Sequence, residues 1–321
     1  MRRRYRALTA ALSALPLALA VAPSAHAADP TGMTSGFYAD PQSSAKQWVA
    51  THPGDGRAAA INASLANTPA ARWFGSWSGT IGTATGAYAG AADQADKLPL
   101  LVAYNIYHRD TCGGQSGGGA TSPSAYASWI AQFAGGITNR PALVILEPDS
   151  LADYGCLNQD QIRERQGMIT GAVAEFNRQA PNTWVYLDAG NPGWVSAATM
   201  AQRLHEAGLR QAHGFSLNIS NHYTTAQNTA YGNAVNGELA ARYGYTKPFV
   251  VDTSRNGNGS NGEWCNAAGR RIGTPTQAGG GAEMLLWIKV PGESDGNCGV
   301  GSGSSAGQFL PDVAYKMIYG Y

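Results

Sequence analysis

The segment Leu143-Val144-Ile145-Leu146-Glu147-Pro148-Asp149-Ser150-Leu151-Ala152 decides the fold class of this chain. Its four leading apolar residues, uninterrupted by a polar one, predict a strand buried on both faces of a parallel sheet. Pro148 cannot extend a central strand, so the strand ends near Glu147. Asp149 then lies at the C-terminal end of a parallel strand, where β/α barrels carry their chemistry. The structural alternative is a helix N-cap formed by Asp149 and Ser150.

The same pattern, an apolar run followed by acidic residues, recurs along the chain. Four further runs lead to Asp110, to Asp188, to Asp252 and to the group Lys289, Glu293 and Asp295. In a closed parallel barrel the C-terminal strand ends converge on one face. The pattern therefore predicts a carboxylate-lined cleft.

Strands and helices are predicted to alternate over most of the chain, which is typical of a parallel sheet covered by helices. Strands are expected to begin near Arg72, Leu98, Ala142, Thr183, Gly214, Pro248 and Glu283. Helices are expected over Ser43–Ala50, Gly56–Ala66, Pro123–Ala134, Gln159–Arg178, Ser196–Ala207, Ala226–Tyr243 and Gln308–Ile318. About seven strands favour an α/β barrel in a single domain, with an open doubly wound sheet as the alternative. No G-x-G-x-x-G follows the first strand, which argues against a dinucleotide site.

The N-terminus is typical of a secretory signal peptide over residues 1–27, which leaves 28–321 as the barrel domain. Four arginines precede an apolar stretch that ends in an A-x-A cleavage site, Ala25-His26-Ala27. Without those four arginines the chain has 18 basic and 21 acidic residues, which gives a formal charge of −3. We therefore expect a secreted, extracellular protein with no membrane span after cleavage and no nucleic-acid partner. A monomer is the default expectation, on which the sequence itself gives no signal.

The four cysteines predict two disulfides, because export leads to an oxidising compartment. Of the three possible connectivities, Cys112–Cys156 and Cys265–Cys298 are favoured, since each pair would tie a loop bearing a catalytic candidate to a neighbouring loop. No C-x-x-C or H-x-x-x-H spacing supports a metal site, and no metal or other cofactor is expected.

Clustered carboxyl groups suit glycosidic bond hydrolysis, which needs one protonated carboxyl for the leaving oxygen and a second group for the water. Like charges help to keep one carboxyl protonated. Trp73, Trp194 and Trp264 are candidates for the flat platforms on which sugar rings pack. Two glycine-rich segments, 111–123 and 296–308, are predicted to form the walls of the cleft.

Together these segments resemble family six of the glycoside hydrolases, the inverting cellulases. Leu143–Ala152 is similar to one family signature and Val102–Gly119 to another. Further similar segments are Tyr186–Gly190, Asp252–Gly259, Glu263–Cys265 and Leu286–Gly296. The resemblance covers nearly the whole chain after the leader and implies a distorted, TIM-like parallel barrel with fewer than eight strands.

The resemblance implies catalytic roles position by position. Asp149 corresponds to the general acid, and Asp110 to the carboxylate that raises the pKa of that acid and helps relay a proton from water. Asp188 corresponds to a further cleft carboxylate that supports the charged transition state. Asp295 corresponds to a disputed base candidate, whose alternative is activation through a chain of waters, and Tyr104 to a tyrosine that crowds the distorted sugar.

The resemblance also implies substrate contacts. Lys289 and Glu293 match polar contacts to the distorted sugar, and Ser116 matches a serine that holds a water. Trp73, Trp194 and Trp264 match positions that stack on glucose rings.

The chain departs from the family pattern at Tyr107, where proline is usual, at Thr111, which separates Asp110 from Cys112, and at Asn191, where histidine is frequent. The extra residue Thr111 is expected to shift Asp110 or its loop.

These observations predict a secreted endo-β-1,4-glucanase that cleaves internal bonds of cellulose with inversion and binds β-1,4-glucan. The short segment between Asp295 and Phe309 favours an open cleft. The alternatives are an exo-acting cellobiohydrolase of the same family, a retaining glycosidase on a similar barrel and a non-catalytic polysaccharide-binding protein.

Overall fold

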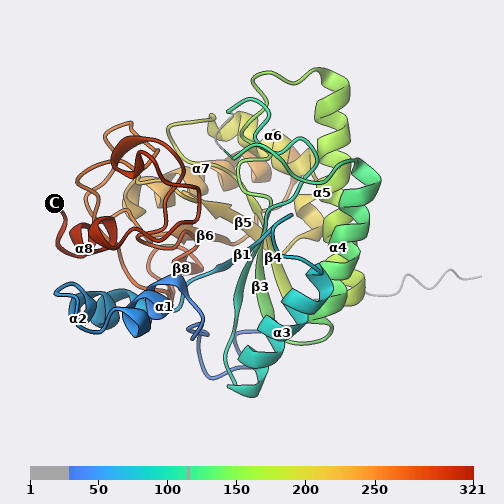
Figure 1. The fold of residues 1–321 in the computed structure, drawn as a ribbon. Coiled ribbons are helices and arrows are strands. Elements are labelled where there is room, and N and C mark those ends of the chain that lie inside the picture. The colour runs from blue at the N-terminus through green and yellow to red at the C-terminus, as the bar shows by residue number, and fades with distance from the viewer. Residues whose placement is uncertain (1–28, 114–115) are drawn as a thin grey trace, which may run out of the picture.

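A curled, mostly parallel sheet forms the centre of the protein (Figure 1). The computed structural model describes residues 29–113 and 116–321. Within them the strand order is β1-β2-β3-β4-β5-β6-β8-β7. The parallel strands are β1 (Arg72–Phe74), β2 (Leu100–Ala103), β3 (Ala142–Leu146), β4 (Thr183–Asp188), β5 (Gly214–Leu217), β6 (Phe249–Asp252) and β8 (Met284–Leu286). The seven predicted strands are thereby confirmed.

The two edges of the sheet approach each other at a seam, which gives the distorted barrel expected from the sequence. The backbone N–H of Ala71 donates to the carbonyl oxygen of Trp287 at 2.8 Å, and the indole N–H of Trp73 donates to Ile288 at 2.8 Å. The strand β7 (Gln277–Ala278), which the sequence analysis missed, runs antiparallel to β8. Its two residues are exposed, so no apolar pattern marks them.

Most of the parallel strands form because both of their faces are buried. Leu143 and Ile145 of β3 belong to the cluster inside the barrel, together with residues of other strands such as Val250 and Leu286. Val144 belongs to the larger core between the sheet and the helices. This division of alternate side chains between two apolar layers explains the uninterrupted apolar run.

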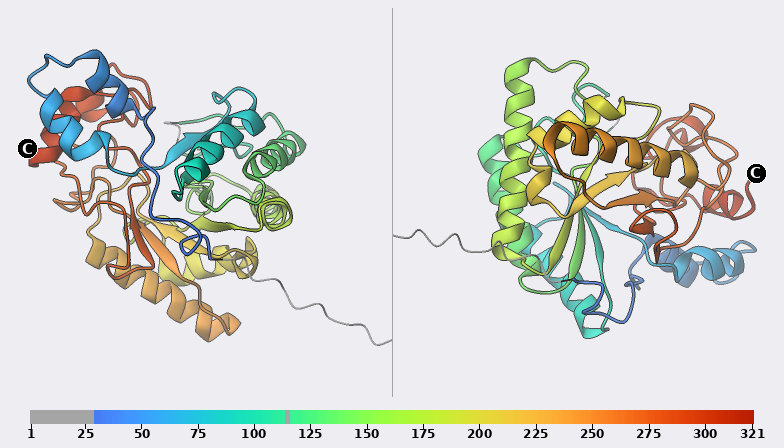
Figure 2. Two further views of the ribbon diagram at one scale, coloured as in Figure 1. Left: turned by 90° about the horizontal axis from the view of Figure 1, so that it is seen from below. Right: turned by 180° about the vertical axis from the view of Figure 1, so that it is seen from behind.

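Helices surround the sheet (Figures 1 and 2). They are α1 (Ser44–Thr51), α2 (Ala58–Ile61), α3 (Ile81–Gln94), α4 (Pro123–Ile137), α5 (Gln159–Gln179), α6 (Ala197–Glu206), α7 (Thr225–Tyr243) and α8 (Pro311–Tyr319). A π-helical turn, Asn62–Ala66, extends α2, and 3-10 turns cover Leu209–Gln211 and Gly299–Gly301. All seven predicted helices are confirmed. Asn158 and Thr224 start α5 and α7 with capping boxes.

Helix α3 was missed because its residues are small and carry no clear apolar stripe. Those same small residues let α3 lie against α4 at close range. A Cβ atom added to Gly86 would lie 3.3 Å from the carbonyl oxygen of Gly136, and one added to Gly136 would lie 2.4 Å from that of Gly82. Glycine is needed at this contact because the two backbones approach each other too closely for a side chain.

Residues near the two ends of the described chain pack together beside the barrel. Helices α1, α2 and α8 lie side by side in both views of Figure 2. Their small core includes Ile61, Ala314 and the buried Trp287 that follows β8. This arrangement places α1 next to the C-terminal ends of the strands.

Two disulfides join loops at those strand ends, with the predicted connectivity. Cys112 after β2 is bonded to Cys156 after β3, and Cys265 after β6 is bonded to Cys298 after β8. The predicted signal peptide lies outside the described residues. Among the helices of residues 29–113 and 116–321, none has the length and apolar character to cross a membrane.

The contact between α3 and α4 predicts opposite effects for two glycine-to-alanine changes. Gly136→Ala is expected to lower the free energy of unfolding by about 1–3 kcal/mol, because the new methyl group would overlap Thr85 and Gly82. Gly171→Ala, at an exposed position of α5 with open space around it, is expected to raise it by about 0.5–1 kcal/mol. Urea denaturation measures both values, and equal effects of the two changes would contradict the close approach.

Candidate active site

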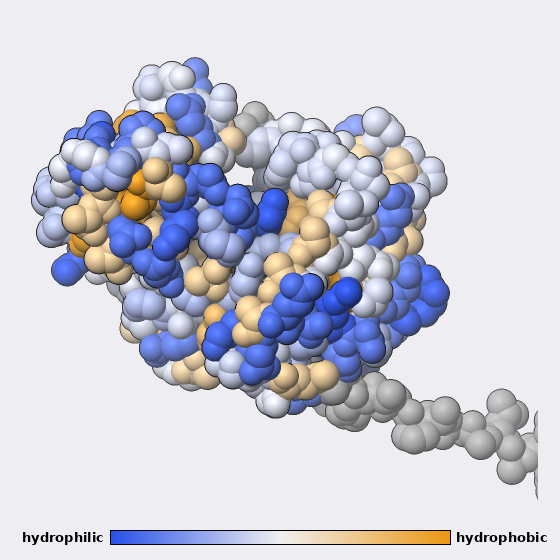
Figure 3. Space-filling view, turned by 60° about the horizontal axis from the view of Figure 1, so that its bottom comes forward, coloured by the Kyte–Doolittle hydropathy of each residue, from blue (hydrophilic) through white to orange (hydrophobic). Residues whose placement is uncertain are grey.

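A cleft of about 1150 Å³ opens at the C-terminal ends of the strands. Figure 3 shows this side of the molecule hollowed between two lobes, with hydrophilic side chains at the rim. Residues of α1 and of the loops after β1, β2, β3, β4, β5, β6 and β8 line the cleft. Both glycine-rich segments contribute to its walls, as predicted, through Gly113, Ser116, Gly117, Ala306 and Gly307.

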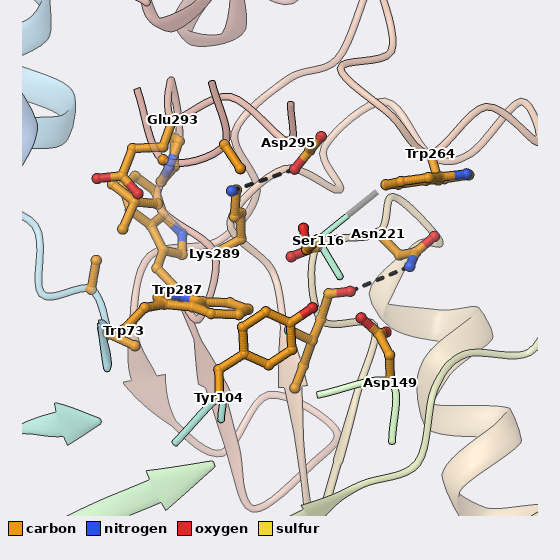
Figure 4. Close-up of a pocket in the computed structure, with 18 of the residues that line it drawn as sticks. Trp73, Tyr104, Ser116, Asp149, Asn221, Trp264, Trp287, Lys289, Glu293 and Asp295 are labelled. Atoms are coloured by element: carbon orange, nitrogen blue, oxygen red, sulfur yellow. Dashed lines mark hydrogen bonds and ion pairs between the residues drawn. The ribbon is translucent and has the colours of Figure 1, made fainter. Parts of the chain in front are cut away.

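Asp149 lies three residues after Leu146, the last residue of β3, and lines this cleft (Figure 4). Its backbone adopts the left-handed conformation, with φ of 69°. The segment forms a turn in which the carbonyl oxygen of Asp149 accepts from the N–H groups of Ala152 and Asp153. No helix starts at Asp149, since α5 begins at Gln159, so the N-cap interpretation is wrong.

Burial and neighbouring carboxyl groups raise the pKa of Asp149 well above its ordinary value of 3.8. The contributing carboxyl groups, in decreasing order, are those of Asp188, Asp110, Asp153 and Asp295. Both effects disfavour the charged form, because a carboxylate loses solvation on burial and is repelled by like charges. Asp149 therefore keeps its proton at a higher pH than an ordinary aspartate does.

Asp110 and Tyr104 form a hydrogen-bonded pair beside Asp149. The hydroxyl of Tyr104 donates to Oδ2 of Asp110 at 2.6 Å, and both residues line the cleft. Burial raises the pKa of Asp110 while the hydrogen bond from Tyr104 lowers it, and the net shift is upward. The extra residue Thr111 thus leaves Asp110 facing the cleft, and Cys112 still reaches its disulfide partner.

Arg109 fixes the loop that carries this pair. Its side chain is buried and donates through Nη1 to the carbonyl oxygen of Tyr104 at 2.6 Å and through Nε to that of Ser116 at 2.9 Å. The guanidinium also lies 4.3 Å from the ring centroid of Tyr104. The backbone of Ser116, one of the predicted site residues, is thereby held at the wall of the cleft.

Asp188, the last residue of β4, lies beneath Asp149 and does not line the cleft. It is buried, and its Oδ2 accepts from the backbone N–H groups of Asp149 at 2.8 Å and Gly190 at 3.3 Å. Burial raises its pKa to about 7, even though backbone N–H donors act in the opposite direction. Asp188 lies at the strand end that the sequence predicted, but its carboxyl group points toward the backbone of the neighbouring loop and not into the cleft.

Asp252 and Glu147 follow the same pattern, so Asp252 does not line the cleft as the sequence pattern predicted. Both side chains are fully buried. Asp252 accepts from the backbone N–H groups of Ser220, Ser254, Ile288 and Lys289. Glu147 accepts from those of Asn105 and Ile106, each at 2.9 Å. The acids that line the cleft are others: Asp110, Asp149, Glu293 and Asp295 among the predicted ones.

Asp295 lies across the cleft from Asp149, in a cationic environment (Figure 4). Its carboxylate pairs with Nη1 of Arg255 at 2.8 Å and with Nζ of Lys289 at 3.4 Å. It also accepts from the backbone N–H of Asn266 at 2.9 Å. Burial alone would raise the pKa of Asp295, but the charges of Arg255 and Lys289 outweigh it and lower the pKa to about 2. Asp295 is therefore ionised at neutral pH.

The remaining polar candidates also reach the cleft. The carboxyl of Glu293 accepts from the hydroxyl of Ser44 at 2.7 Å, which links the β8 loop to the start of α1. Lys289 lies 6.0 Å from the ring centroid of Trp73. Asn191, at the position where the family frequently has histidine, is buried and accepts from the N–H of Gly193. Tyr107 lies with its ring against that of His108.

All three predicted tryptophans line the cleft. Trp73 packs edge-on against Tyr104, with ring centroids 5.2 Å apart, whereas Trp194 and Trp264 are each 44% exposed. Two further tryptophans line it and were missed, Trp77 and Trp287. No apolar or acidic pattern surrounds Trp77, and Trp287 follows a strand run that predicted only a core role. In the described part of the chain, no group of three His, Cys, Asp or Glu side chains is arranged to hold a metal ion.

A model of the family described as "Glycosyl hydrolases family 6" matches residues 33–318. The chain belongs to this glycoside hydrolase family. Endoglucanase 1 of Streptomyces halstedii is 80% identical over 321 residues, the full length of both chains. Endoglucanase A of Thermobispora bispora is 41% identical over 97% of this chain and 67% of its own.

A solved structure of another family 6 enzyme has a similar fold. The endoglucanase Cel6 of Mycobacterium tuberculosis, in complex with methyl-cellobiosyl-4-deoxy-4-thio-β-D-cellobioside, is 39% identical. It matches with a TM-score of 0.82 over 91% of this chain and 99% of that chain. The family model, these relatives and the barrel therefore agree with the resemblance seen in the sequence.

The buried Glu147 predicts a pH-dependent stability. Burial raises its pKa to about 7 from an ordinary value of 4.5, so the native state binds this proton more tightly than the unfolded chain does. Its contribution to stability is fully present below pH 4.5 and is lost as the pH rises through 7. Glu147→Gln keeps an acceptor oxygen but does not ionise. Between pH 4.5 and 7 its free energy of unfolding, measured by urea denaturation, is therefore expected to decrease by about 1–3 kcal/mol less than that of the parent.

Glu263→Gln, at an exposed glutamate of the loop after β6, is the matched control. Parallel stability curves for the parent and the Glu147→Gln variant would contradict the pKa of about 7.

Proposed function

We propose that this protein is a secreted endo-β-1,4-glucanase that cleaves internal bonds of cellulose with inversion, with Asp149 as the general acid. The observation that carries the proposal is the setting of Asp149. It lines a cleft at the C-terminal strand ends, and burial and nearby carboxyl groups raise its pKa. A general acid must hold its proton at the working pH, and this setting provides that condition.

In the proposed mechanism Asp149 donates its proton to the glycosidic oxygen as the bond to the leaving sugar breaks. Asp110 helps to keep Asp149 protonated through like-charge repulsion, since Asp110 is among the groups that raise its pKa. Because Asp110 is hydrogen-bonded to Tyr104 and faces the cleft, it also suits proton exchange with water. Asp188 acts from below, by accepting from the backbone of Asp149 and by repelling charge on its side chain.

Asp295 has the opposite setting and a different role. A pKa of about 2 makes its carboxylate a weak base, because a good general base has a pKa near the working pH. We assign it the stabilisation of positive charge on the sugar ring in the transition state. This assignment favours activation of the attacking water through a chain of waters over direct proton abstraction by Asp295. The contrast between Asp149 and Asp295 matches the separation of pKa values seen in acid–base pairs.

The lining of the cleft suits a neutral polymer of glucose. Trp73, Trp194 and Trp264 supply flat apolar faces, and Lys289 and Glu293 of the same lining supply hydrogen-bonding groups. The Mycobacterium tuberculosis relative was solved with a cello-oligosaccharide analogue. The substrate proposed here is accordingly β-1,4-glucan.

Cleavage at internal bonds is favoured over exo-action by the openness of the cleft. Trp194 and Trp264 each leave 44% of their surface exposed, so the described loops do not roof them. The Cys265–Cys298 disulfide also holds the segment after Asp295 next to the loop of Trp264. The relatives of Streptomyces halstedii and Thermobispora bispora are named endoglucanases, which supports the same choice.

Secretion is supported by the signal-peptide pattern of residues 1–27 and by the two disulfides. Such bonds form and persist in oxidising compartments. We propose that the mature enzyme acts as a monomer and without a cofactor.

The proposal predicts that Asp149→Asn loses catalysis while the fold persists. Asparagine tolerates the left-handed backbone of this position but carries no transferable proton. Reducing-end release from carboxymethylcellulose is expected to fall by about a thousandfold. The melting temperature is expected to stay the same or rise, because the change removes a carboxyl group repelled by its neighbours.

The parent enzyme supplies the comparison. Its viscosity loss should run ahead of reducing-end release, and fresh products of cellohexaose should appear first as the α-anomer in proton NMR. A β-anomer first would contradict inversion, and substantial activity in Asp149→Asn would contradict its role as the acid. Binding without any hydrolysis by the parent would favour the polysaccharide-binding alternative.

A further inference from the structure

The three most exposed tryptophans of the described chain all lie at the same cleft. Trp77 is 57% exposed, and Trp194 and Trp264 are each 44% exposed. All three contribute to the lining of the cleft. A single exposed apolar residue needs no explanation, but large aromatic side chains gathered at one cavity mark a binding surface. Trp77 is the most exposed of them, and neither the sequence signatures nor the proposed mechanism uses it.

The indole of Trp77 is held in place by its own turn. The turn after β1 is closed by Ser78, whose N–H donates to the carbonyl oxygen of Gly75 at 3.0 Å. The hydroxyl of Ser78 in turn accepts from the N–H of Gly75 at 3.1 Å. A Cβ atom on Gly75 would lie 2.4 Å from the indole of Trp77. Glycine at position 75 therefore lets the ring pack against the backbone.

Arg109 fixes Trp77 from the loop after β2. Its guanidinium carbon lies 5.4 Å from the ring centroid of Trp77, a cation–π contact. Arg109 is itself immobilised, because it is buried and donates to the carbonyl oxygens of Tyr104 and Ser116. An aromatic face that is fixed before a ligand arrives loses little conformational entropy on binding.

Trp77 also continues the wall formed by the predicted site residues. Trp73 contacts Tyr104 edge-on at 5.2 Å, Tyr104 lies 4.3 Å from the guanidinium of Arg109, and Arg109 reaches Trp77. The four side chains thus form one continuous surface that runs from the middle of the cleft to its rim. A sugar ring beyond those at the catalytic centre would meet Trp77 at the end of this surface.

We propose that Trp77 is a stacking platform for an additional glucosyl unit of β-1,4-glucan at the rim of the cleft. This inference rests on the proposed function and extends it, because it makes affinity depend on the length of the substrate chain. Stacking of a sugar on Trp77 benefits only substrates long enough to reach the rim.

The test compares Trp77→Ala, Trp77→Phe and the parent on cellotetraose and cellohexaose. For Trp77→Ala, kcat/KM on cellohexaose is expected to fall about five- to tenfold, mainly through KM, with a smaller loss on cellotetraose. Trp77→Phe keeps a flat ring and is expected to recover most of that loss. The matched control is Tyr319→Ala, which removes an exposed aromatic ring, 52% exposed, that does not line the cleft.

Two outcomes would overturn the proposal. Equal loss of kcat on both substrates would mean that Trp77 only supports Arg109 and the loop of Asp110. Unchanged kinetics on both would mean that no sugar contacts the ring. Calorimetric titration of cellohexaose into Asp149→Asn, with and without Trp77→Ala, repeats the comparison without catalysis. Failure of the parent to hydrolyse either substrate would contradict the proposed function, whereas a loss of affinity on removing Trp77 would still support the platform.

Discussion

Buried carboxyl groups that accept backbone N–H groups of neighbouring loops are the constraint on which this active site depends. Glu147, Asp188 and Asp252 each lie at the C-terminal end of a strand or just beyond it. Glu147 binds the loop after β2, Asp188 binds the loop after β3, and Asp252 binds the loops after β5 and β8. Each loop carries at least one side chain of the cleft. A buried carboxyl group is costly unless it is hydrogen-bonded, so these contacts hold the loops in defined positions.

The charged groups around the cleft shift the carboxyl pKa values on its two sides in opposite directions. On one side Asp149 lies over Asp188 and beside Asp110, and each neighbour disfavours its ionisation. On the other side Arg255 and Lys289 keep Asp295 charged. In the proposed mechanism, one barrel thereby presents a proton donor and a permanent negative charge to the same sugar.

Much of this could be predicted from sequence because the parallel strands are buried on both faces and end abruptly. That pattern located five of the seven parallel strands and placed Asp149 at the mouth of the barrel. It missed α3, whose glycines serve a close contact with α4 that is visible only in three dimensions. The pattern predicts where a strand ends but not where the side chain at that end points. Asp188 and Asp252 turn toward backbone N–H donors of other loops. Trp77 was missed for a similar reason, because its exposure depends on Gly75 and on Arg109 from another loop.

The central claim is that burial and neighbouring carboxyl groups keep Asp149 protonated while Asp295 stays ionised. The most direct test is a ¹³C NMR titration of aspartate side-chain carboxyl groups, assigned with Asp149→Asn and Asp295→Asn variants. The account predicts that Asp149 remains protonated well above pH 4, that Asp295 is ionised throughout, and that Asp188→Asn lowers the pKa of Asp149. An Asp149 carboxyl that titrates near its ordinary value of 3.8 would contradict the account.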